Sequence, residues 1–180
     1  MFCHCGSNEQ LESCCLAIIK AERQAQSPEQ LMRSRFSAYV MKNAQYIFDS
    51  YSQKVQKSQS INDIKIWANT CQFIELVIHH MSPFNDDNSK LQSATPTVEF
   101  TVHYLITNKL YKMSEKSRFI KEPLTISNDT NDGSHWVYLD GDVYQHIEVG
   151  IIKRNDLCPC AVNKAKKNAQ KFKKCCGKSH

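Results

Sequence analysis

Residues 95–108, TPTVEFTVHYLITN, alternate apolar and polar side chains along most of their length. A period of two residues is typical of a β-strand with one buried face, because successive side chains of a strand point to opposite sides. The apolar positions of this stretch are Val98, Phe100, Val102, Tyr104 and Ile106. The pattern predicts a strand of an antiparallel sheet with one face in the core and one face polar.

Three neighbouring stretches predict further strands. Residues 73–81, FIELVIHHM, are rich in β-branched side chains, and residues 110–122, LYKMSEKSRFIKE, repeat the alternation less regularly. In 131–143, NDGSHWVYLDGDV, turns are expected at Asp132-Gly133 and Asp140-Gly141, with a strand between them. A polar and mobile linker is expected over 82–96. Together these stretches predict an antiparallel sheet of about four strands from 73 to 145.

Helices are expected before the sheet, from about 28 to 70. Ser27 is suited to cap a helix N-terminus, and Pro28 fits the first helical position. A second helix is expected over 44–51 and a third after Ser60, over 61–71. Helices followed by consecutive strands indicate an α+β domain and not a chain of βαβ units.

Composition and length agree with a folded globular protein. The chain has 180 residues, of which 41% are hydrophobic and 23% charged. No apolar stretch approaches the roughly 18 residues that a membrane-spanning helix needs. The N-terminus lacks the basic and then apolar pattern of a secretory signal. A cytoplasmic protein is therefore expected, in a compartment where thiols stay reduced.

Eight of the nine cysteines form two similar clusters, one at each end of the chain. Each cluster has the order C-x-C and then CC, with eight intervening residues in the first and fourteen in the second. The members are Cys3, Cys5, Cys14 and Cys15, and then Cys158, Cys160, Cys175 and Cys176. The ninth, Cys71, lies among apolar residues and is expected in the core.

Each cluster can supply a complete shell of four thiolates, which favours bound metal over disulfides or free thiols. Zn²⁺ takes four such ligands tetrahedrally when its role is structural, and a filled shell leaves no position for water or substrate. We therefore expect two structural Zn²⁺ sites without catalytic function. The longer loop of the second cluster is expected to be more mobile.

Both clusters resemble the SEC-C motif, a zinc-binding module also found at the C-terminus of the bacterial preprotein translocase ATPase. The first keeps CHCGS and CC, and the second keeps RNDLCPC and KFKKCCG, with Ala161-Val162 in place of the usual Gly-Ser. The stretches LMRSRFSAYVMKNAQYI, EKSRFIKE and HWVYLDGDV are similar to the YchJ family. This resemblance implies SEC-C modules over 1–26 and 151–180. Between them, over 27–150, it implies a middle domain of the nuclear transport factor 2-like (NTF2-like) type, a cone in which a curved sheet wraps around helices.

The charge of the chain is uneven. Residues 153–180 contain nine Lys or Arg and one acid, Asp156, a net charge of +8, although the whole chain carries only +5. A basic tail of this kind suits an acidic partner surface. We therefore expect a non-catalytic adaptor, and the resemblance implies an acidic protein surface such as that of a chaperone, or a ribosome, as its partner. The lysines expected to dock are Lys166, Lys167, Lys173 and Lys174.

The alternative is a small-molecule binder or enzyme that uses the pocket of the cone. Polar side chains on the inward side of the strands and on the first helix could converge in this pocket. The candidates are Arg33, Arg35, His103, Glu115, Ser117, Trp136 and Tyr138. No spacing of nucleophile, base and orienting group is recognisable among them, so no catalytic residue is assigned.

Overall fold

One antiparallel sheet forms the centre of the protein. In the computed structural model, which describes residues 1–83, 95–123, 133–164 and 166–178, each strand pairs with the next along the chain. The strands are β1 (Gln72–Met81), β2 (Thr97–Ile106), β3 (Lys109–Pro123) and β4 (Ser134–Ile151). The predicted four-stranded antiparallel sheet is confirmed. The expected linker over 82–96 and the expected turn at Asp132-Gly133 lie largely outside the described residues.

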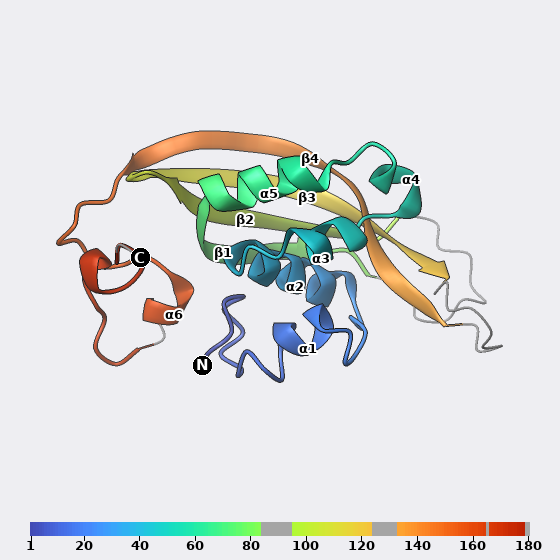
Figure 1. Cartoon of the computed structure of the whole chain (residues 1–180), viewed down its shortest axis with the longest axis horizontal. Coiled ribbons are helices and arrows are strands. Elements are labelled where there is room, and N and C mark those ends of the chain that lie inside the picture. The colour runs from blue at the N-terminus through green and yellow to red at the C-terminus, as the bar shows by residue number, and fades with distance from the viewer. Residues whose placement is uncertain (84–94, 124–132, 165, 179–180) are drawn as a thin grey trace.

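Helices lie against one face of the sheet, which curves over them (Figure 1). They are α2 (Pro28–Val40), α3 (Ala44–Asp49), α4 (Gln53–Gln56) and α5 (Ile61–Thr70). The Ser27 side chain accepts a hydrogen bond from the Gln30 backbone N–H, and Pro28 occupies the first turn, as the sequence predicts. Ser60 caps α5 in the same way, through the N–H of Asp63. The α+β class and the helical region from 28 to 70 are confirmed.

The alternation in 95–108 corresponds to the two faces of β2. Val98, Phe100, Val102 and Tyr104 are nearly inaccessible to solvent and belong to the core between sheet and helices. Cys71 lies in the same core and is 1% exposed, as predicted. Burial raises the pKa of its thiol to about 11, so Cys71 is a small core residue and not a reactive nucleophile.

The predicted turn at Asp140-Gly141 is wrong, because β4 continues through it as an unbroken strand. Asp140 and Asp142 each form an ion pair with Arg118 of β3, at 2.6 Å from Asp142, so the strand pairing persists across the glycine. The glycine is needed for a different reason. A Cβ atom on Gly141 would overlap the carboxylate of Glu115 and lie 2.9 Å from the hydroxyl of Tyr138.

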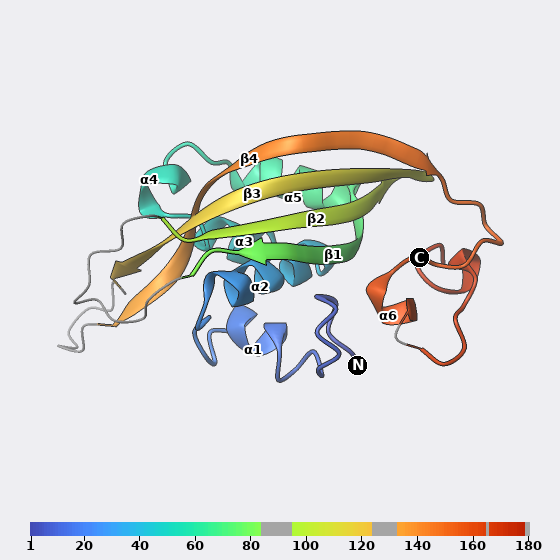
Figure 2. The same ribbon diagram turned by 180° about the vertical axis from the view of Figure 1, so that it is seen from behind.

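The two ends of the chain lie outside the sheet and its helices (Figures 1 and 2). The N-terminal segment contains α1 (Cys15–Ile19), which packs beside α2. The C-terminal segment leaves the end of β4 and contains α6 (Ala161–Lys164) and a 3₁₀ turn, η1 (Phe172–Lys174). Within the described residues, no helix is both long and apolar enough to cross a membrane.

Candidate metal centres and neighbouring cavities

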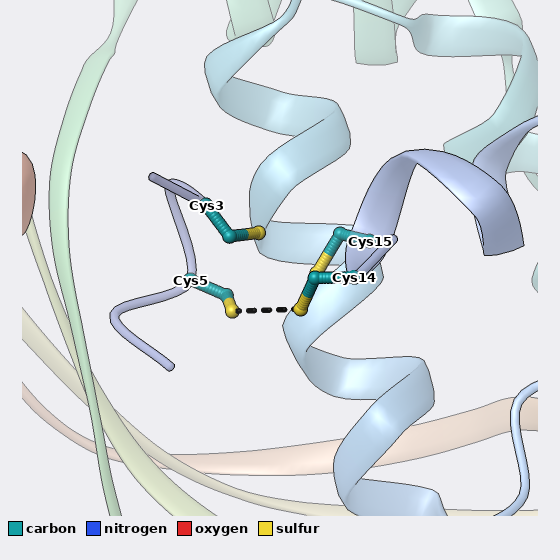
Figure 3. Close-up of side chains that lie close together, drawn as sticks. All are labelled: Cys3, Cys5, Cys14 and Cys15. Atoms are coloured by element: carbon teal, nitrogen blue, oxygen red, sulfur yellow. Dashed lines mark hydrogen bonds between the residues drawn. The ribbon is translucent and has the colours of Figure 1, made fainter. Parts of the chain in front are cut away.

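The N-terminal cysteines come from two short pieces of chain that face each other. Cys3 and Cys5 lie on an extended segment followed by a tight turn, in which Gly6 has a φ of 80° and Asn8 a φ of 64°. Cys14 and Cys15 lie at the start of α1. Figure 3 shows the four sulfur atoms pointing toward a common centre. All four residues are buried, with 7% exposure or less.

The sulfur geometry fits a tetrahedral metal site. The four Sγ atoms lie within 4.8 Å of one another, and the Cys5–Cys14 and Cys14–Cys15 Sγ separations are both 3.8 Å. Four sulfurs at the usual Zn–S distance of about 2.3 Å would be about 3.8 Å apart along each tetrahedral edge. A disulfide would bring two of them to about 2.05 Å. The arrangement therefore matches a metal-thiolate shell and not a pair of disulfides.

The electrostatics of the cluster call for a cation. Hydrogen bonds from the Cys15 and Cys5 thiols lower the pKa of Cys3, whereas burial raises the pKa of Cys14 to about 12. Without a cation, Cys3 thus ionises more readily than Cys14, since thiolates in contact repel each other. A bound dication favours all four thiolates.

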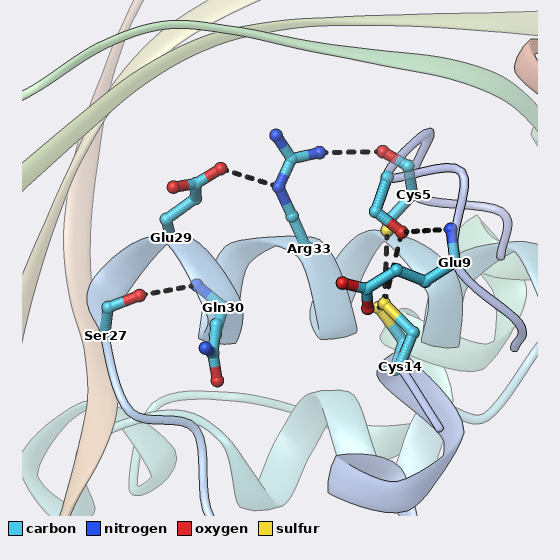
Figure 4. Close-up of polar contacts among 9 residues, drawn as sticks. Cys5, Glu9, Cys14, Ser27, Glu29, Gln30 and Arg33 are labelled. Atoms are coloured by element: carbon cyan, nitrogen blue, oxygen red, sulfur yellow. Dashed lines mark hydrogen bonds and ion pairs between the residues drawn. The ribbon is translucent and has the colours of Figure 1, made fainter. Parts of the chain in front are cut away.

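Two arginines hold the backbone of this module in place. Arg33 of α2 donates from Nη1 to the carbonyl of Cys5 at 2.9 Å, and its Nε contacts Glu29 Oε1 at 2.7 Å (Figure 4). Arg23 donates to the carbonyl of Cys14 at 3.1 Å. These contacts fix the two carbonyls beside the sulfur cluster and join the module to the helical layer.

The C-terminal cluster has the same sulfur arrangement with more exposure. Its four Sγ atoms also lie within 4.8 Å of one another, with Cys160 and Cys175 separated by 3.5 Å. Hydrogen bonding from Cys176 lowers the pKa of Cys160 to about 5, and burial raises that of Cys175 to about 12. Cys158 and Cys160 are buried, whereas Cys175 and Cys176 are partly exposed.

Asn163 organises the longer loop of the C-terminal cluster. It is 1% exposed, and its Nδ2 donates to the carbonyl of Cys158 at 2.8 Å and to that of Gln170 at 3.1 Å. Its Oδ1 accepts the N–H of Gln170 at 2.8 Å. One side chain thus closes the fourteen-residue loop in place of a glycine turn. Nothing in the sequence AVNK singles this asparagine out.

The C-terminal module is attached to β1 and β2. Phe172 packs against Ile74 and Leu105 of the sheet. Gln72 donates from Nε2 to the carbonyl of Cys176 at 2.6 Å. Lys164 forms an ion pair with Glu75 of β1. The C-terminal module is therefore docked on the sheet, whereas the N-terminal module is attached to α2.

A cleft of about 730 Å³ lies between the two modules, beside α2 and β1. Its basic lining residues are His4, Lys42, Lys166, Lys174 and Lys178. Burial lowers the pKa of His4, so the positive charge of the cleft comes from its lysines. Among the described residues, no Asp or Glu lines the cleft. Lys42 and Lys178 line the cleft although they were not among the lysines predicted to dock. Of the predicted lysines, Lys167 and Lys173 do not line it.

A second cavity, of about 110 Å³, lies between the sheet and the helices. Four of the predicted pocket residues line it, namely Arg35, Glu115, Ser117 and Tyr138. Tyr39, Tyr51 and Trp67 also line it and were not predicted, because only the packed fold brings them to β3 and β4. The predicted pocket is therefore present with part of its predicted lining.

Three predicted pocket residues lie elsewhere. Arg33 is two positions from Arg35 on α2 and so points to a different face, toward the N-terminal module; it does not contact Glu115. His103 points to the outer face of the sheet, where its Nδ1 lies 3.3 Å from Glu75 Oε2. Trp136 is 4% exposed in the core without lining the cavity.

A family model described as the YchJ middle NTF2-like domain matches residues 27–141. The chain belongs to the YchJ family. A UPF0225 protein of Vibrio cholerae is 33% identical over 98% of this chain and 100% of its own length. A UPF0225 protein of Enterobacter sp. (strain 638) is 30% identical over 97% of each chain.

Two solved structures of SEC-C motif containing proteins resemble this YchJ-family chain. The solution structure of the one from Rhodopseudomonas palustris is 25% identical, with a TM-score of 0.63 over 81% of this chain and all of that one. The crystal structure of the one from Psychrobacter arcticus is 26% identical, with a TM-score of 0.62 over 95% of this chain and 87% of that one. The resemblance to the YchJ family and the NTF2-like fold are confirmed.

Proposed function

We propose that this YchJ-family protein is a non-catalytic adaptor. In this proposal two zinc-bound cysteine modules form walls of a basic cleft, and an acidic segment of a partner protein docks there. The observation that carries the proposal is the lining of the cleft, which combines four lysines with no carboxylate among the described residues. Lys166, Lys174 and Lys178 are exposed there.

Zinc is the metal that the ligands favour. Four thiolates in a tetrahedral arrangement are a soft ligand set that suits Zn²⁺ and leaves no open coordination position. In the N-terminal module the four sulfurs are also shielded from solvent. The metal would thus hold the loops in shape and supply no hydrolytic chemistry. Each Zn–S₄ centre carries a charge of −2, which the neighbouring lysines offset in part.

The chemistry of the cleft favours an acidic peptide over RNA. Besides its lysines, the cleft is lined by aliphatic groups of Val40, Ile74 and Val162. Its aromatic rings, Phe36 and Phe73, are at most 8% exposed, so they offer no platform on which bases could stack. A peptide with both carboxylates and apolar side chains can use the two kinds of lining group together.

Fluorescence anisotropy of the zinc-loaded protein tests the proposal. The probes are a short Glu/Leu peptide and a single-stranded RNA of equal charge, each at about 50 and 300 mM NaCl. The triple variant Lys166→Gln/Lys174→Gln/Lys178→Gln neutralises the three lysines that the C-terminal module contributes to the cleft. The matched control Lys54→Gln/Lys57→Gln/Lys65→Gln makes the same charge change on exposed lysines of α4 and α5 and the turn after α4.

We expect the peptide to bind more tightly than the RNA, with affinity falling as salt rises. The cleft variant should weaken peptide binding about three- to 150-fold, because three exposed charge pairs at about 0.2–1 kcal/mol each contribute about 0.6–3 kcal/mol together. The control should change it less than about twofold. Equal losses in both triple variants would show that net charge alone attracts the peptide. Tighter RNA binding would instead favour the ribosome as partner and contradict an acidic protein segment.

A further inference from the structure

The cavity between the sheet and the helices contains a buried arginine whose surroundings are mainly aromatic. Arg35 is 4% exposed, and its guanidinium carbon lies 4.5 Å from the ring centroids of both Tyr51 and Tyr138. Nη1 donates to the Ile47 carbonyl at 3.1 Å and contacts Ser50 Oγ. A hydrogen bond with the Tyr51 side chain also favours the charged guanidinium. A guanidinium has five N–H donors, so these three partners leave two of them for a group inside the cavity that Arg35 lines.

A carboxylate lines the same cavity. Glu115 of β3 is 8% exposed, and its Oε1 accepts hydrogen bonds from Ser117 Oγ at 2.5 Å and from Tyr138 Oη at 3.0 Å. Burial raises the pKa of Tyr138, so this phenol stays neutral and donates. Over the described residues, Oε2 accepts no hydrogen bond. One oxygen of the carboxylate is thus held by the protein and the other is available.

The two opposite charges do not form an ion pair with each other. No nitrogen of Arg35 lies within 4.0 Å of a Glu115 oxygen. Buried charges are costly unless each is paired and hydrogen bonded. A cation and an anion that share a cavity, each with unused hydrogen-bonding capacity, are complementary to a guest that carries both charges.

The volume of the cavity limits the size of such a guest. At about 110 Å³ it is smaller than the engineered cavity of about 150 Å³ that accepts benzene. The guest therefore has at most about five non-hydrogen atoms, fewer than the six of benzene. Most of the other lining groups are apolar, including Phe100, Val102 and Met113. They exclude water and strengthen the interactions of the charged groups.

We propose that this cavity binds a short zwitterionic amino acid, with its carboxylate on Arg35 and its ammonium on Glu115 Oε2. A net-neutral guest of this class leaves the summed charge of the cavity unchanged, whereas a lone anion or cation would add an unbalanced buried charge. Glycine has the required size and both charges. This site is separate from the cleft between the modules, and the inference stands whether or not the proposed adaptor function holds.

Nuclear magnetic resonance of the full zinc-loaded chain tests the inference. Glycine, acetate and methylammonium are titrated separately, and the Arg35 side-chain Nε–H signal and the backbone signals of the cavity residues are followed. The variant Glu115→Gln removes the charge of the carboxylate with little change in shape. Glu29→Gln, which removes a carboxylate paired with Arg33 outside the cavity, is the matched control.

Glycine should shift the cavity signals of the wild-type chain with saturation, and acetate and methylammonium should bind at least tenfold more weakly. Glu115→Gln should weaken glycine at least tenfold and strengthen acetate, while Glu29→Gln should bind glycine as the wild type does. Glycine binding by Glu115→Gln with the wild-type affinity would overturn the inference, as would tighter binding of acetate than of glycine by the wild type. Absence of saturation with glycine would also overturn the inference and would indicate that the cavity holds only water.

Should Glu115→Gln fail to fold, Ser117→Ala provides a second variant. It removes a hydroxyl that orients the carboxylate and keeps the charge, and it should weaken glycine by a smaller factor than Glu115→Gln. Unchanged glycine affinity in Ser117→Ala, together with unchanged acetate affinity, would also count against a role for Glu115.

Discussion

The substitution Gly141→Ala measures how closely β4 approaches the carboxylate of β3. The added Cβ would overlap the carboxylate of Glu115, lying 2.7 Å from its Cδ, and would lie 2.9 Å from the hydroxyl of Tyr138. Overpacking a core typically costs about 1–3 kcal/mol. Displacement of the carboxylate also strains its hydrogen bonds from Ser117 and Tyr138, at about 0.5–1.5 kcal/mol each. We expect the free energy of unfolding to fall by about 3 kcal/mol.

Thermal and urea unfolding of the zinc-loaded protein, followed by circular dichroism, measure this cost. A loss of about 3 kcal/mol should lower the Tm by about 6–12 °C for a chain of this length. The double variant Gly141→Ala/Glu115→Ala completes a thermodynamic cycle. If the collision with Glu115 is the cause, Gly141→Ala should cost much less in the Glu115→Ala background. A cost under about 0.5 kcal/mol in the wild-type background, or the same cost in both backgrounds, would refute the reasoning.

Two further predictions concern the attachment of the modules. Arg33→Gln removes the hydrogen bond to the Cys5 carbonyl. It should speed metal release to a chelator at least about tenfold, since a charged hydrogen bond contributes about 1.5–3 kcal/mol. Glu29→Gln should change release less, and equal effects would contradict a direct role of Arg33. The contact with His103, and then that with Lys164, lowers the pKa of Glu75. The interactions of the Glu75 carboxylate therefore stabilise the protein at neutral pH, and this stabilisation is lost as the pH falls below about 4.5. Glu75→Gln should therefore speed hydrogen exchange in the C-terminal module at pH 7, and its effect should shrink as the pH falls below about 4.5. An effect that does not change with pH would contradict the ion pair.

The elements that the sequence predicted well depend on local patterns. The alternation in 95–108 predicted both the position of β2 and which of its faces is buried. A shift of one residue would turn all its apolar side chains away from the core. Ser27 and Pro28 locate the start of α2 for a similar reason, since the cap is formed by neighbours in sequence. The cysteine clusters were also recognisable, because their eight ligands occur as two repeated spacings.

The features that the sequence did not predict depend on tertiary contacts. Asp140-Gly141 has the composition of a turn, and only the approach of Glu115 from β3 explains the glycine within a continuous strand. The cleft lining could not be predicted either, because Lys42 and Lys178 are far apart in sequence and line the same cleft only in the folded chain.

The zinc content and coordination of the purified protein test the central claim most directly. Protein prepared under reducing conditions without a chelator should contain two equivalents of zinc per chain by elemental analysis. X-ray absorption at the zinc edge should show four sulfur neighbours at about 2.3 Å. Fewer than about one equivalent with oxidised thiols, or a shell that includes nitrogen or oxygen ligands, would contradict two closed Cys₄ centres.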